Sequence, residues 1–205
     1  LNLSWTETVS LHFDDEDRDE FLTETMTSLF KLFAAACFGI VACMPFVFPI
    51  LINEKYVAGY DQILLLMYAM LFRVLVGLYS CIYVAQKNAK KIAYTSISAA
   101  IINITVNLIL INKIKIFAAS ISTLVAFFSM FIIRYIDVNK TVHMRIRKPI
   151  IIGSILIGTM LIGTYYCENK MIQLIALCIT AIYAVLTNVD MLKSGMKLVK
   201  SRFGK

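Results

Sequence analysis

The sequence predicts an all-α integral membrane protein built as a bundle of six transmembrane helices. Its 205 residues are 60% hydrophobic and only 16% charged, and their mean hydropathy is +0.78. These values are far more apolar than those of an average soluble domain. Six apolar runs are also long enough to cross a bilayer, which takes about 20 helical residues. Because lipid cannot hydrogen-bond the backbone, only helices or closed barrels span it.

Residues 1–28 are predicted to form a cytoplasmic lead-in that is acidic and then amphipathic. Its block DDEDRDE, from Asp14 to Glu20, places acids where the positive end of a helix dipole favours them. Apolar residues then recur at roughly helical spacing, as in a helix lying at a membrane surface. The block lacks the glycine and terminal glutamate of a calcium loop, so we interpret it as a solvated run of charge. With no signal-peptide pattern after Leu1, we expect a piece of a longer protein.

Residues 29–190 are predicted to form the six-helix transmembrane lobe. Short connections favour antiparallel hairpins between neighbouring helices. Pro45 and Pro49 each remove a backbone donor near the end of the first span, which predicts a kink or an unwound end there. Five cysteines without a CxxC pair are interpreted as packing residues. The predicted spans are Leu29–Ile52, Gln62–Ala85, Ile92–Ile111, Ile116–Ile136, Pro149–Tyr166 and Met171–Val189.

The distribution of basic residues predicts the orientation of the chain. Of its 20 Lys and Arg residues, fifteen fall on the side that holds the N-terminus and four on the opposite side, while Arg73 lies within a span. Short basic loops resist translocation, so both termini are expected in the cytoplasm, with residues 191–205 as a basic cytoplasmic tail. The net charge of +7 is therefore interpreted as a topology signal, and no nucleic-acid partner is expected.

Arg73 is the first candidate for a substrate cavity. An arginine at the centre of a span costs about 2.5–3.5 kcal/mol on insertion scales, and such residues usually face a bundle interior or a wet cavity. Ala69, Gly77 and Cys81 lie on the same helical face and predict a groove of small residues around the guanidinium. Arg73 is then either a cavity cation that binds phosphate through its rigid fork or a structural charge paired with a carbonyl or an acid.

Asn103 and Asn107 are the other cavity candidates, one turn apart in the third span. Polar and small stripes of this kind favour close helix packing, and contact with a substrate is the alternative. His12 and His143 are isolated, without metal-ligand spacing, and neither a catalytic triad nor a phosphate loop is present. We therefore predict no enzyme activity and no metal or other cofactor.

Four segments occur in a fairly specific order and spacing between Trp5 and about Lys140. They are EDRDEF (Glu16–Phe21), NEKYVAGYD (Asn53–Asp61), IYVAQKNAKK (Ile82–Lys91) and IINITVNLILI (Ile101–Ile111). Together they resemble the C-terminal half of bacterial O-antigen and polysaccharide flippases, in the multidrug, oligosaccharidyl-lipid and polysaccharide exporter superfamily. This family usually has two glycines where the present chain has Lys115 and Ala118, and the lysine argues against a close backbone turn.

The resemblance implies one lobe of a two-lobe exporter, with the N-terminal lobe of the same protein as a partner. Its implied activity is to pass an undecaprenyl-diphosphate-linked oligosaccharide across the bacterial inner membrane by alternating access, for lipopolysaccharide O-antigen or capsule biosynthesis. Cations such as Arg73 would attract the diphosphate. Membrane lipids and polysaccharide polymerase machinery are the further partners implied. Two alternatives remain: an exporter of peptidoglycan precursor or drugs, and a non-transporting interaction subunit of a polysaccharide synthesis complex.

Overall fold

The structure is a computed structural model that describes residues 2–13 and 15–203, with the side chains of 6–13, 15–53 and 57–194. Side chains of the predicted basic tail beyond residue 194 lie outside this description, as does Asp14. The described chain contains helices and short connections without a β-strand. Six helices are long and apolar enough to cross a membrane. The predicted all-α membrane bundle is therefore confirmed, and the protein is a multi-pass membrane protein.

Each predicted span has one helical counterpart, and most boundaries agree to within a few residues. Two helices are much longer than predicted: α7 continues past Val189 to Phe203, and α2 begins at Arg18, so that it joins the acidic lead-in to the first span without a break. Asp19 and Glu20 lie in its first turn, where they oppose the positive end of the helix dipole. The elements are α1 (Asn2–Leu11), α2 (Arg18–Leu51), the 3₁₀ turn η1 (Glu54–Gly59), α3 (Tyr60–Ala85), α4 (Ala89–Ile114), α5 (Ile116–Val138), α6 (Lys148–Tyr165) and α7 (Lys170–Phe203).

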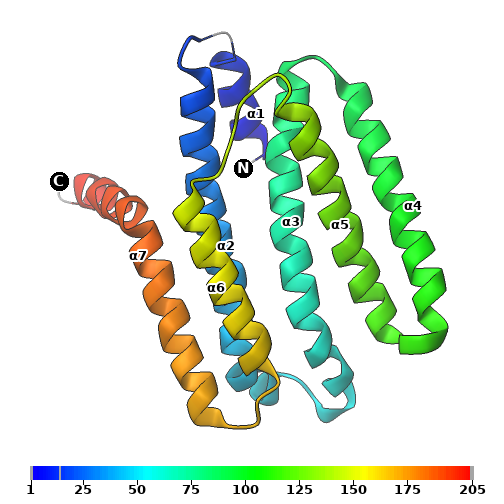
Figure 1. The fold of residues 1–205 in the computed structure, drawn as a ribbon. Helices are drawn as coiled ribbons and strands as arrows, with labels where there is room; N and C mark the ends of the chain where they lie inside the picture. The colour runs from blue at the N-terminus through cyan, green and yellow to red at the C-terminus, as the bar shows by residue number, and fades with distance from the viewer. Residues whose placement is uncertain (1, 14, 204–205) are drawn as a thin grey trace.

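The helices pack as two groups that meet where α2 contacts α3 (Figure 1). One group contains α3, α4 and α5, with α1 packed on α3, and the other contains α2, α6 and α7. Successive long helices run in opposite directions, so the loops alternate between the two ends of the bundle. The predicted antiparallel hairpins are present in α2–α3, α4–α5 and α6–α7, whereas α5 and α6 belong to different groups and do not pack as a hairpin.

Two local predictions concerned breaks in the chain. The prolines were expected to give a kink or an unwound end; α2 continues through Pro45 and Pro49 to Leu51, so the unwound end is not formed, and the kink stays a prediction. Lys115 alone connects α4 to α5, with φ 48° and ψ −121°. This left-handed φ favours glycine, yet the close turn that a lysine argues against is present.

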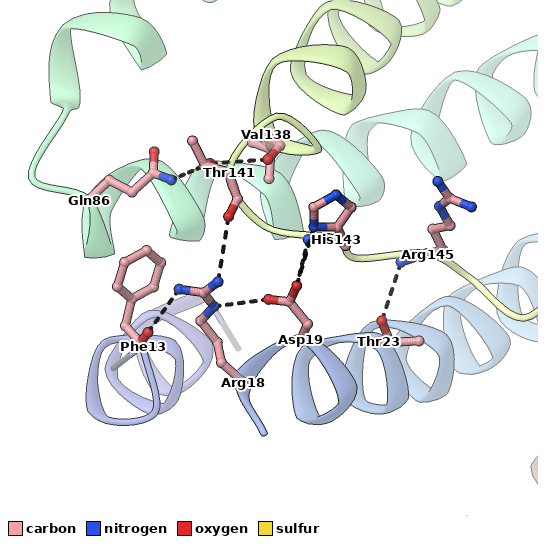
Figure 2. Close-up of polar contacts among 9 residues, drawn as sticks. All are labelled: Phe13, Arg18, Asp19, Thr23, Gln86, Val138, Thr141, His143 and Arg145. Atoms are coloured by element: carbon pink, nitrogen blue, oxygen red, sulfur yellow. Dashed lines mark hydrogen bonds and ion pairs between the residues drawn. The ribbon is translucent and has the colours of Figure 1, made fainter. Parts of the chain in front are cut away.

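The connection between α5 and α6, residues 139–147, forms a strap along the first turns of α2 (Figure 2). Alternate backbone N–H groups of the strap donate to side chains one helical turn apart: His143 to Asp19 Oδ2 (3.0 Å), Arg145 to Thr23 Oγ1 (3.3 Å) and Arg147 to Thr27 Oγ1 (3.4 Å). Two residues of extended chain advance about 6.6–6.8 Å, and four residues of helix about 6.0 Å. The two-residue repeat of the strap and the four-residue repeat of α2 therefore stay in register over three hydrogen bonds.

The other face of the strap is buried against the bundle. Val142 and Met144 are fully buried, as is expected when alternate residues of an extended segment point to opposite sides. Arg18 ties the strap to the start of α2, because its guanidinium donates to the carbonyls of Phe13 and Thr141 and pairs with Asp19 (Figure 2). The acidic block is thus only partly a solvated run of charge.

Candidate functional site

Arg73 lies in an open groove of about 530 Å³ between α3, α4 and α5, which we call the Arg73 groove. Its side chain is exposed, and its guanidinium lies 5.9 Å from the centre of the Phe127 ring. Among the described residues no carboxylate forms an ion pair with it; its Nη1 donates to the Met70 sulfur at 3.8 Å. The other residues that line the groove are Ser96, Ala99, Ala100, Asn103 and Ile104 of α4, and Ala126, Phe127 and Met130 of α5.

The small residues around Arg73 come from neighbouring helices and not from its own. Of the three predicted on α3, Ala69 and Cys81 are buried, and the sulfur of Cys81 accepts a hydrogen bond from Thr6 of α1 at 3.2 Å. The prediction that these three residues form the groove is wrong, because none of them lines it. Four helical residues turn through about 400°, so the face drifts by about 40° at each step. Small side chains of α4 and α5 instead leave the space that the guanidinium occupies.

The two asparagines are placed differently. Asn103 lines the Arg73 groove and also connects α4 to α5: its Nδ2 donates to Thr123 Oγ1 at 3.5 Å, and Ser122 Oγ donates to its Oδ1 at 3.4 Å. Asn103 therefore both packs α4 against α5 and lines the groove. Asn107 is not among the lining residues, and its buried Oδ1 has no hydrogen-bond partner in the described part of the chain.

Arg134 of α5 is the functional candidate that the sequence reasoning missed. It was counted with the basic residues at one membrane surface, but its side chain is only 1% exposed. Its nitrogens donate to Thr95 Oγ1 (3.0 Å), the Val76 carbonyl (3.0 Å), Ser80 Oγ, the Ile92 carbonyl (3.4 Å) and Ser96 Oγ (3.3 Å). All of these acceptors are neutral. The sequence feature that could have identified Arg134 is a set of hydroxyl residues at its level on α3 and α4, namely Ser80, Thr95 and Ser96.

A second hollow of about 440 Å³, which we call the Lys91 groove, lies at the end of the bundle where α4 begins and α5 ends. Asp137 Oδ2 accepts from Lys91 Nζ at 2.7 Å and from the Tyr83 hydroxyl at 2.9 Å. The groove is lined by Tyr83, Lys91, Tyr94, Thr95, Ile133, Ile136, Asp137 and Lys140.

Arg134 lies between the two grooves. Thr95 and Ser96 are neighbours on α4, and each accepts a hydrogen bond from its guanidinium. Thr95 lines the Lys91 groove, whereas Ser96 lines the Arg73 groove. The region where α3, α4 and α5 meet, which we call the polar seam, therefore carries cations at three levels: Arg73, Arg134 and Lys91. The hydroxyl groups of Thr95 and Ser96 lie between them. Such an arrangement suits an anionic or hydroxyl-rich ligand, because arginine binds phosphate through two parallel N–H bonds.

The hollow between α2, α3 and α6 has a different character. Its volume is about 370 Å³, and its lining is almost entirely aliphatic and aromatic, without a charged side chain among the described residues. The Ser154 hydroxyl in this lining already bonds the Tyr183 hydroxyl at 2.8 Å. A sugar or a phosphate would lose its hydration there without finding partners, so the polar seam of α3, α4 and α5 is the better candidate.

Within the described residues, His, Cys, Asp and Glu side chains form no group of three that could hold a metal ion. His12 lies 2.6 Å from Asp15, and His143 lies 3.6 Å from Asp19. All five cysteines are free. In comparisons with known proteins, no family model, no curated protein and no solved structure matches the chain.

Proposed function

We propose that the chain is part of a flippase that moves an undecaprenyl-diphosphate-linked oligosaccharide across the cytoplasmic membrane of a bacterium, for surface polysaccharide biosynthesis. The proposal rests on the position of Arg73. It lies at the middle of a membrane-spanning helix, exposed in an open groove, without a carboxylate partner among the described residues. Asn103 and Ser96 line the same groove.

The physical reason is the cost of an unpaired cation at that depth. A central arginine costs about 2.5–3.5 kcal/mol on insertion scales, and a diphosphate in the groove would offset this cost through charge-assisted bidentate hydrogen bonds. The amide of Asn103 and the hydroxyl of Ser96 would meet sugar hydroxyl groups. No covalent step is needed, so the groove would bind and release its ligand without catalysis.

The open groove also fits a two-lobe arrangement. One wall consists of α3, α4 and α5, and the opposite wall would come from the N-terminal lobe of the same protein. Basic residues gather at the end of the bundle where α3 and α5 end and α4 begins, including Lys87, Lys90, Lys91 and Lys140. By the positive-inside rule, we propose that this end and the C-terminus face the cytoplasm.

Complementation of a flippase-deficient strain with the full-length gene tests the proposal. Arg73→Ala should remove most surface polysaccharide, and Arg73→Lys should restore part of it, because lysine keeps the charge but not the bidentate fork. Arg147→Ala is the matched control, since Arg147 is exposed, pairs with Glu24 at 2.7 Å and lies outside both grooves. Membrane levels of each variant are compared by immunoblot. Undiminished polysaccharide with Arg73→Ala would refute the cavity role.

Peptidoglycan precursor carries the same polyprenyl diphosphate, so an exporter of that substrate would use the same groove. Parallel complementation of a strain deficient in peptidoglycan-precursor export separates the two substrates. A wild-type gene that restores neither strain, while its protein is present in the membrane, would favour the non-transporting interaction subunit.

A further inference from the structure

We propose that the Lys91 groove binds the phosphate headgroup of an anionic phospholipid, with the acyl chain lying along α4 and α5. This site is distinct from the Arg73 groove. It does not rest on the proposed function, because a bound structural lipid is expected whether or not the protein transports a substrate.

The charge of the groove favours an anion. Lys91 and Lys140 line it together with one carboxylate, Asp137, which already accepts two hydrogen bonds. Arg134 lies directly behind the groove wall, because its Nε donates to the lining residue Thr95 at 3.0 Å. Its other partners are neutral hydroxyls and carbonyls. Two lining cations therefore share one carboxylate, with the positive charge of Arg134 behind the wall, and the net positive charge favours a phosphate.

The walls of the groove favour a lipid over a soluble anion. Ile133 is 39% exposed and Ile136 55% exposed, and both belong to a membrane-spanning helix. Tyr94 is 70% exposed on the neighbouring helix, and tyrosine is enriched where headgroups meet acyl chains. An ionic hollow that continues into exposed apolar side chains matches a molecule with a phosphate at one end and a hydrocarbon chain at the other.

The position of the groove along the bundle agrees with a headgroup site. It lies where α3 ends, α4 begins and α5 ends, all at one end of the bundle (Figure 1). Lys87 and Lys90 flank it in the connection and first turn before Lys91. Lysines next to a membrane-spanning helix attract anionic lipids, and the attraction falls off within a Debye length. A phosphate at this level would remain near the membrane surface.

The test measures lipid retention by the full chain in nanodiscs that contain equal amounts of dioleoyl phosphatidylglycerol and dioleoyl phosphatidylcholine. Native mass spectrometry counts each lipid that stays bound. Lys91→Gln with Lys140→Gln should weaken phosphatidylglycerol binding about 25-fold, at about fivefold per lysine. The matched control is Lys113→Gln with Lys115→Gln, which removes the same charge from the exposed opposite end of the α4–α5 hairpin. It should change binding less than twofold.

Lys140→Gln alone provides a variant that leaves the Lys91–Asp137 pair intact. We expect about a fivefold loss of phosphatidylglycerol binding, with helical content unchanged by circular dichroism; this variant decides the question if the double variant does not fold. The proposal is overturned if wild type retains both lipids equally, or if the Lys113/Lys115 control loses as much as the Lys91/Lys140 variant. Displacement of phosphatidylglycerol by millimolar inorganic phosphate would also overturn it, because the groove would then be a site for soluble phosphate.

Discussion

Replacing Arg134 tests whether the protein needs its charge or only its hydrogen bonds. The side chain makes five hydrogen bonds to neutral acceptors. Side-chain hydrogen bonds within membrane proteins contribute about 0.6 kcal/mol each, so the set contributes about 3 kcal/mol. Burying the charge costs about 2.5–3.5 kcal/mol. Arg134→Met removes both contributions, and we expect the free energy of unfolding to change by less than about 1 kcal/mol.

Arg134→Lys should be the more damaging substitution, although it conserves the charge. Lysine offers three donors from one nitrogen, so at least two of the five hydrogen bonds are lost while the cost of burial stays. The expected loss is about 1.2 kcal/mol at about 0.6 kcal/mol per bond. Both variants are compared by unfolding in mixed micelles of increasing denaturing detergent, followed by circular dichroism. A loss of 3 kcal/mol or more for Arg134→Met, with Arg134→Lys neutral, would show that the charge itself stabilises the fold and would refute this reasoning.

Three further substitutions test local contacts. Asp19→Ala removes the acceptor for the His143 N–H of the strap and the ion-pair partner of Arg18. Amide hydrogen exchange of the strap should become at least fivefold faster, from a loss of about 1 kcal/mol. Unchanged exchange would mean that the buried face alone holds the strap on α2. Lys115→Gly should raise the free energy of unfolding by about 1 kcal/mol, because φ 48° is strained for a residue with a Cβ; equal or lower stability in detergent titration would contradict this. Gly158→Ala should lower the free energy of unfolding by about 1 kcal/mol, since a Cβ there would lie 3.2 Å from the Tyr68 hydroxyl. Gly163→Ala is the control and should be neutral or stabilising, because Gly163 has open space around it. Equal effects of the two substitutions would show that Tyr68 moves without cost.

The six spans could be predicted because the length of an apolar run is enough to identify a membrane-spanning helix. The second span was expected at Gln62–Ala85, and α3 runs over Tyr60–Ala85. The start of α2 could not be predicted in the same way. Residues after Phe21 have the pattern of a surface helix, but Leu22 and Met26 are fully buried. The strap covers this part of α2, and a contact with a segment about 120 residues away leaves no signal in the local pattern.

The candidate site was predictable in part. Arg73 and Asn103 could be selected because charged and amide side chains are costly in a span. That they line one groove depends on how α3, α4 and α5 pack, which the sequence does not specify. Arg134 was misplaced because it lies four residues from the end of α5, where a lysine or arginine can usually extend to the interface. Its burial requires hydroxyl groups from two other helices at the same level.

The strap limits how the two helix groups can move against each other. Its three N–H groups bond to acceptors that repeat once per turn of α2. Intermediate positions would leave all three donors without an acceptor at once, so a slide of the strap along α2 would have to cover a full four-residue repeat, about 6.0 Å. A shift by one repeat would set a strap N–H against Lys31, whose side chain offers no acceptor. The three hydrogen bonds together therefore define one axial position of the strap on α2.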